Sequence, residues 1–91
     1  MRKVSLTVRG RVQGVGFRFM TKMVADKLGI VGTVKNQWDG SVYIEAGGSP
    51  EKVAEFINLI KASPSPSGRV ETCEITELPN LQLPSAFDVR Y

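Results

Sequence analysis

The chain has 91 residues, of which 42% are hydrophobic and 23% charged, and its formal net charge is +3. This length predicts a single domain over residues 1–91, and the apolar content is too high for a disordered chain. The basic residues are scattered rather than clustered. The charge therefore does not favour a nucleic-acid binder and is compatible with an anionic small-molecule ligand.

Histidine is absent, and Cys73 is the only cysteine. A lone cysteine excludes an internal disulfide and favours a cytoplasmic location. The absence of histidine excludes an imidazole base, a phosphohistidine intermediate and a histidine-based metal site. No segment has the pattern of a signal peptide or the length of an apolar membrane span, so we expect no membrane association.

The first predicted elements are a strand over 4–8, which alternates apolar and polar residues, and a helix over 17–28. The expected core face of this helix comprises Phe17, Met20, Val24 and Leu28, widened by Phe19 and Met23. Gly29 follows as a left-handed stop to the helix.

A hairpin is predicted next. Residues 31–37 and 41–46 alternate as strands, and Asp39-Gly40 between them is a tight-turn pair, a role that is sufficient to explain Asp39. We expect Trp38 to pack on this hairpin. Ser49 and Pro50 then predict the N-cap and first turn of a helix over 50–61, whose expected inner face comprises Val53, Phe56, Ile57 and Ile60.

The remaining segments complete a sheet. After a proline- and serine-rich connection, strands are predicted over 69–78 and 87–91, with a β-bulge where the alternation changes phase between Val70 and Cys73. The element order predicts an α+β, ferredoxin-like split β-α-β fold, which is an antiparallel sheet with two helices on one face. The pattern leaves open which sheet edge takes the short C-terminal strand.

The segment Gly10-Arg-Val-Gln-Gly-Val-Gly-Phe-Arg18 joins the first strand to the first helix. Glycines let backbone N–H groups turn toward a bound group, and a helix start leaves N–H donors unpaired. Because the guanidinium of Arg18 can grip two phosphate oxygens, the segment predicts a cradle for a small, doubly charged oxyanion.

The topology brings a second polar residue to the same place. A right-handed crossover carries the ends of the first two strands to one sheet edge, about 10 Å apart across the inserted third strand. Arg18 and Asn36 could then converge on one ligand, with Asn36 holding a water by one amide group and a substrate oxygen by the other. Asn36 is no base near neutral pH, which suits acyl phosphates because their carboxylate leaving group needs little help.

Two motifs resemble the signatures of the acylphosphatase family: Gly10-x-Val12-Gln13-Gly14-Val15-x-Phe17-Arg18, and Gly32-x-Val34-Lys35-Asn36-x-x-x-Gly40-x-Val42 with Gly48 further on. The resemblance covers essentially the whole chain. It implies metal-independent hydrolysis of an acyl phosphate to a carboxylate and inorganic phosphate, and we expect no cofactor. One departure is Thr33, which stands where the family usually has an aromatic residue and should face away from Val34, changing packing or a rim rather than the chemistry.

The resemblance also implies roles for individual residues. Arg18 would bind phosphate and Asn36 would orient water, as the catalytic pair. The phosphate-binding residues implied by the first motif are Gln13, Gly14, Val15, Gly16, Phe17 and Arg18. The residues leave open whether Arg90 is solvated or adjusts the field near this site.

Two other functions are compatible with the pattern. The chain could be a module that binds phosphate or an acyl phosphate without turnover. It could also be an RNA-binding domain of the same fold class, although its third strand carries one aromatic residue, Tyr43, and no basic residue. We expect a monomer that acts on a small-molecule acyl phosphate, is inhibited by its product inorganic phosphate, and has no nucleic-acid partner.

Overall fold

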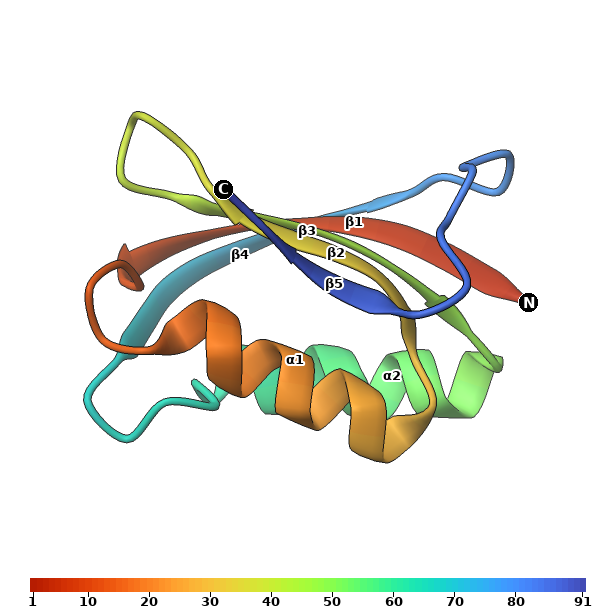
Figure 1. Cartoon of the computed structure of the whole chain (residues 1–91), viewed down its shortest axis with the longest axis horizontal. Helices are drawn as coiled ribbons and strands as arrows, with labels where there is room; N and C mark the ends of the chain where they lie inside the picture. Colours follow the sequence, from red (N-terminus) through yellow and green to blue (C-terminus); the bar gives the residue numbers. More distant parts are fainter.

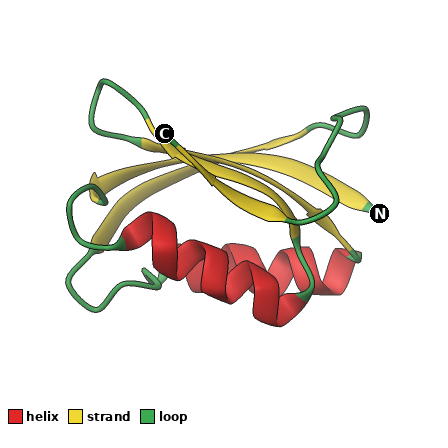
Figure 2. Cartoon of the chain, in the orientation of Figure 1, coloured by secondary structure: helices red, strands yellow, loops and turns green.

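The alternating segments pair into one sheet in a computed structural model that describes residues 1–91 (Figure 1). The elements in chain order are β1 (Arg2–Arg11), α1 (Phe17–Leu28), β2 (Val31–Asn36), β3 (Val42–Gly48), α2 (Pro50–Lys61), β4 (Arg69–Glu77) and β5 (Phe87–Arg90). Both helices lie on the same face of the sheet (Figure 2), which confirms the predicted fold class.

The strand order is β4-β1-β3-β2-β5. Because β3 pairs antiparallel with both β1 and β2, these two strands run in the same direction with β3 between them, as predicted. The C-terminal strand β5 takes the β2 edge and pairs with β2 in parallel, from Gly32 opposite Phe87 to Lys35 opposite Arg90. The sheet is therefore mixed rather than wholly antiparallel, since the chain crosses from the β4 edge to the opposite edge before it forms β5.

The predicted irregularity lies in β4. Arg9 pairs with Thr72 and Gly10 with Val70, so Glu71 is an extra residue with no partner on β1. Strand β1 is longer than its alternating segment because β3 and β4 hydrogen-bond to it on both sides.

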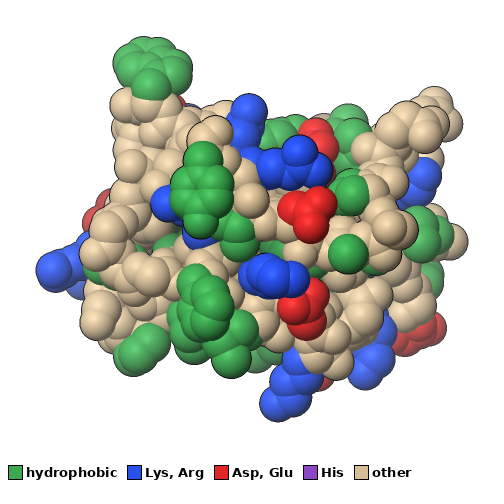
Figure 3. Space-filling view, viewed as in Figure 1, with side chains coloured by type: hydrophobic (Ala, Val, Ile, Leu, Met, Phe, Trp, Pro, Cys, Tyr) green, Lys and Arg blue, Asp and Glu red, His purple; other side chains and the backbone are tan.

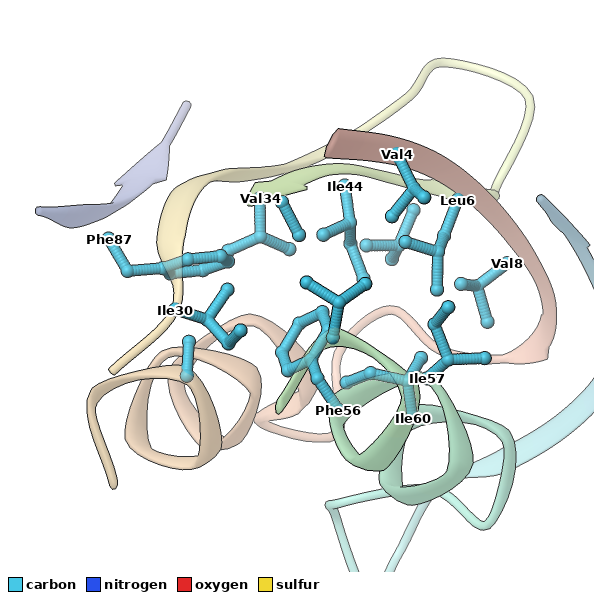
Figure 4. Packing of buried hydrophobic residues seen from close by; sticks show 14 of the residues in the cluster. Val4, Leu6, Val8, Ile30, Val34, Ile44, Phe56, Ile57, Ile60 and Phe87 are labelled. Carbon is cyan, nitrogen blue, oxygen red and sulfur yellow. The ribbon is translucent and has the colours of Figure 1, made fainter. Parts of the chain in front are cut away.

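The core fills the space between the sheet and the helices (Figure 4). Val4, Leu6 and Val8 of β1 point from the sheet toward Phe56, Ile57 and Ile60 of α2. The predicted inner face of α2 is confirmed, since its four apolar residues are all buried.

The predicted core face of α1 is only partly right. Phe17 is buried, and the buried stripe continues through Thr21 and Ala25. Phe19 and Met23, however, are 63% and 50% exposed, so their assignment to the core is wrong. At about 100° per residue, Phe19 lies about 200° around the helix from Phe17 and faces away from the sheet.

Gly32 marks the closest approach of β2 to β3. Its φ is +148°, and a Cβ there would collide with the main-chain oxygen of Glu45. By contrast, Gly40 lies in the β2–β3 turn at φ +92°, and a Cβ there would meet no heavy atom within 4 Å. At both positions the positive φ would strain any other residue. Only at Gly32 would a side chain also collide with the neighbouring strand.

We expect Gly32→Ala to lower the free energy of unfolding by about 2–6 kcal/mol, the sum of about 1–3 kcal/mol of backbone strain and a similar cost for displacing β3. Gly40→Ala is the matched control and should lose only the strain contribution. Urea denaturation of both variants measures this difference, and equal losses would contradict the role assigned to Gly32.

Candidate active site

The loop between β1 and α1 turns at two glycines. Gly14 and Gly16 have φ values of +73° and +76°, and a Cβ on either would meet nothing within 4 Å, so these glycines serve the backbone path rather than packing. Gly16 is the N-cap of α1, and no side chain caps this helix. Met20 donates its N–H to the Gly16 oxygen at 3.1 Å, so the N–H groups of the preceding helical residues have no carbonyl within the helix. This arrangement suits an anion.

A cavity of about 200 Å³ lies beside this loop. Its volume is below the roughly 300–1,000 Å³ typical of sites for drug-sized ligands, so it fits a small group. The lining residues come from the loop, α1 and the ends of β2 and β5: Val12, Gly14, Gly16, Phe17, Arg18, Phe19, Asn36, Val89 and Tyr91. The structure thus brings Arg18 and Asn36 to one cavity.

Arg18 is held by the end of the chain. Its Nη1 donates to the main-chain oxygen of Arg90 at 2.9 Å, and its Cζ lies 4.6 Å from the ring centroid of Tyr91. The ion pairs of the molecule involve other residues, so no carboxylate neutralises the Arg18 guanidinium. The remaining N–H donors of this group are available to a ligand. The side chain of Arg90, whose role was open, pairs instead with Asp88 at 3.3 Å.

Asn36 is the last residue of β2. Its Oδ1 is buried and accepts no hydrogen bond from the protein. A buried polar atom left in this state costs about 1–3 kcal/mol, so the atom favours a donor such as a water molecule in the cavity. The amide therefore has the chemistry needed to hold water beside Arg18.

Gln13 links the loop to the β2–β3 turn. Its Nε2 donates to the main-chain oxygens of Gln37 and Ser41, both at 2.8 Å. These bonds direct the Gln13 side chain away from the cavity. Of the predicted phosphate-binding residues, Gln13 and Val15 do not line the cavity, whereas the other four do: Gly14, Gly16, Phe17 and Arg18. Val15 instead accepts a hydrogen bond at its carbonyl from Ser65 Oγ, in the connection between α2 and β4.

The turn after Asn36 has its own polar network. Asp39 Oδ1 accepts hydrogen bonds from the hydroxyl and the N–H of Ser41, and Oδ2 accepts one from Arg9 Nη1 at 2.9 Å. These hydrogen bonds lower the pKa of Asp39 to about 2, and the bond from the Ser41 hydroxyl has the largest effect.

Trp38 at the tip of the turn is fully exposed, so the expectation that it packs on the hairpin is wrong. The turn projects beyond the sheet, and the side chain has no strand surface to cover.

Thr33 lies on the opposite face of the sheet from the buried Val34, as expected. It borders a shallow depression there with Lys35, Tyr43 and Glu45. The residue that departs from the family pattern is therefore outside the cavity that holds Arg18.

The predicted site omits four residues that line the cavity: Val12, which belongs to the first motif, and Phe19, Val89 and Tyr91. The positions of Val89 and Tyr91 depend on the edge that β5 joins, which the pattern left open. Phe19 could have been found, because its rotation from Phe17 around the helix is fixed by the helical repeat.

No group of three or more His, Cys, Asp or Glu side chains lies close enough to hold a metal ion. Neither helix combines the length and hydrophobicity needed to cross a bilayer.

Burial raises the pKa of the Cys73 thiol on β4, which disfavours its reactive thiolate form.

The class that the fold and the cavity define is a small α+β domain with one site suited to an oxyanion. A family model described as Acylphosphatase matches residues 4–89. The acylphosphatase of Enterococcus faecalis is 56% identical over 90 residues, 98% of each chain, and that of Latilactobacillus sakei is 55% identical over 86 residues, 94% of each chain. The crystal structure of acylphosphatase from Bacillus subtilis superposes with a TM-score of 0.95 at 38% identity, covering 100% of both chains.

The chain belongs to the acylphosphatase family, whose members are hydrolases of carboxyl–phosphate anhydride bonds. The family to which the two sequence motifs pointed is thereby confirmed.

The lowered pKa of Asp39 predicts how acid affects stability. Because the pKa lies near 2 in the folded state, below its ordinary 3.8, the carboxylate stabilises the fold fully above about pH 4 and loses this effect as the pH falls toward 2. We expect the difference in unfolding free energy between wild type and Asp39→Asn to be largest near pH 5 and to shrink at pH 2. Urea denaturation at both pH values measures it, and a difference independent of pH would contradict the assignment.

Proposed function

We propose that the chain hydrolyses acyl phosphates without a metal ion, with phosphate held by the 13–18 loop and Arg18 and water oriented by Asn36. One observation carries the proposal: Arg18 and Asn36, which come from different elements, line the same small cavity beside the glycine loop.

Phosphate binding follows from the loop and one charge. The main-chain N–H groups at the start of α1 lack helical partners and suit the phosphate oxygens. Arg18 supplies the only charged side chain in the cavity lining. Held by the Arg90 carbonyl and the Tyr91 ring, it is already oriented before the substrate enters, which lowers the cost of ordering it in the transition state.

Water would be presented by Asn36. Its buried Oδ1 accepts a hydrogen bond from the water, whose oxygen then attacks phosphorus. The new bond joins the water oxygen to phosphorus, the bond between phosphorus and the acyl oxygen breaks, and a carboxylate leaves with the bonding electrons. The water proton passes to solvent or to the phosphate product. A carboxylate is a stable leaving group, so the step needs no strong general base.

We further propose that the chain acts as a cytoplasmic monomer on a small molecule, without a nucleic-acid partner. The lone thiol of Cys73 is compatible with a reducing compartment. On the open face of β3, the Tyr43 hydroxyl donates to Glu45 at 2.9 Å. An acidic side chain paired with the strand's one aromatic residue is unfavourable for binding RNA on that face.

Arg18→Ala and Asn36→Ala are each expected to reduce the turnover of benzoyl phosphate by ~10²–10³, the usual effect of losing one preorganised donor. Phosphate release measures activity, and circular dichroism verifies that both variants fold. Arg69→Ala and Asn58→Ala remove exposed side chains of the same types away from the cavity and should leave activity unchanged. Either site variant keeping more than about a tenth of wild-type turnover would contradict the proposed roles.

Chelation separates this chemistry from metal-assisted hydrolysis. The cavity lining contains no carboxylate or thiol side chain that would hold a metal ion, so EDTA should leave kcat/KM for benzoyl phosphate unchanged. A loss of activity in EDTA that an added divalent ion restores is the contrary result.

The same assay distinguishes a hydrolase from a module that only binds phosphate. We expect inorganic phosphate to inhibit competitively, because it occupies the same loop as the substrate. Saturable phosphate binding by a chain that releases no product from benzoyl phosphate would instead favour the non-catalytic alternative.

A further inference from the structure

Large hydrophobic side chains are exposed around the cavity. Phe19 is 63% exposed and Tyr91 is 99% exposed, and both line it. Met23, one helical turn after Phe19, is 50% exposed on the same side of α1. Figure 3 shows hydrophobic side chains over the first half of α1 and beside the C-terminus, on the face where these elements meet. Isolated exposed apolar residues need no explanation, but several gathered at the mouth of a site do.

On the proposed function, the phosphoryl group and the attacking water lie beside the glycine loop, Arg18 and Asn36 in this cavity of about 200 Å³. The acyl group must then extend away from these residues, along the rest of the lining. The remaining lining residues with large, exposed side chains are Phe19 of α1 and Tyr91 after β5, so the acyl group meets an aromatic lining there.

We propose that Phe19 and Tyr91 form an acyl-recognition rim that selects acyl phosphates with an aromatic or bulky apolar acyl group. The inference rests on the proposed function and adds the substrate class. Two aromatic rings remove apolar surface of the acyl group from water, and they can stack on an aromatic acyl group edge-to-face or offset. They offer nothing comparable to an acetyl group.

The two rim residues differ in what else they do. Tyr91 also stacks on the Arg18 guanidinium, so its loss would disturb phosphate binding as well. Phe19 forms no aromatic pair and no cation–π contact within the protein, and its exposed helical position accepts alanine, a strong helix former. Phe19 is therefore the residue whose replacement isolates recognition of the acyl group.

The test compares kcat/KM for benzoyl phosphate and acetyl phosphate in wild type, Phe19→Ala and Phe19→Leu. We expect the benzoyl-to-acetyl ratio to fall about fivefold or more in Phe19→Ala, which is less than the roughly 10–200-fold typical of an enclosed apolar pocket because the rim is partly solvated. Phe19→Leu should retain most of the preference. Leu59→Ala removes a hydrophobic side chain that is 41% exposed on α2, away from the cavity, and should leave the ratio unchanged.

The outcomes separate the two proposals. If wild type hydrolyses neither compound, the proposed function fails. If wild type hydrolyses both but the ratio in Phe19→Ala stays at the wild-type value, or falls equally in Leu59→Ala, the rim does not select the acyl group and the inference is overturned. A concentration-dependent dimer of wild type that Phe19→Ala abolishes, with an unchanged ratio, would assign the exposed face to self-association instead.

Discussion

The site depends on one side-chain amide that ties two loops together. Gln13 donates both of its Nε2 hydrogens to the β2–β3 turn, to the main-chain oxygens of Gln37 and Ser41 at 2.8 Å. The loop that carries Gln13 leads into the helix start of Arg18, and the turn begins directly after Asn36. The two hydrogen bonds therefore help to set the separation between the glycine loop and the amide of Asn36. Because Gln13 is neutral, it makes this link without adding a charge that would compete with Arg18 for the anion.

The rest of the fold fixes the two ends of that link. Phe17 is 1% exposed and anchors the start of α1 in the core, directly after the exposed, left-handed Gly16. Ser65, which is buried, holds the Val15 carbonyl from outside the loop. On the other side, the absence of a side chain at Gly32 lets the main chains of β2 and β3 pair closely. The glycine loop is thus held by packed, hydrogen-bonded residues at its ends, so that it forms a preorganised site although glycine itself is conformationally free.

The sequence specifies most of this arrangement, because local rules decide it. Helical and strand periods, the glycine loop, the Asp39-Gly40 turn and the phase change in β4 all follow from neighbours along the chain. The position of β5 does not, because a four-residue edge strand is placed by the path of the preceding loop and by its hydrogen bonds to β2. The contact of Tyr91 with Arg18 could not be predicted from the sequence either, because it depends on the edge that β5 joins. Phe19 lies outside the core because its angle around the helix, and not its hydrophobicity, decides which way the side chain faces.

The outward position of Phe19 gives the site two chemically different halves. The inner half consists of backbone N–H groups, Arg18 and Asn36, which interact with oxygens and charge. The outer half consists of aromatic rings, which interact with carbon. The scissile bond of an acyl phosphate separates a charged phosphoryl group from an acyl group that can be apolar, so the bond would lie where the halves meet. On the proposed function, the rings would contact the leaving group, while the buried Oδ1 of Asn36 would accept a hydrogen bond from the attacking water. A polar interior beneath an apolar rim would therefore orient both the substrate and its attacking water, with Arg18 as the only charged side chain in the lining.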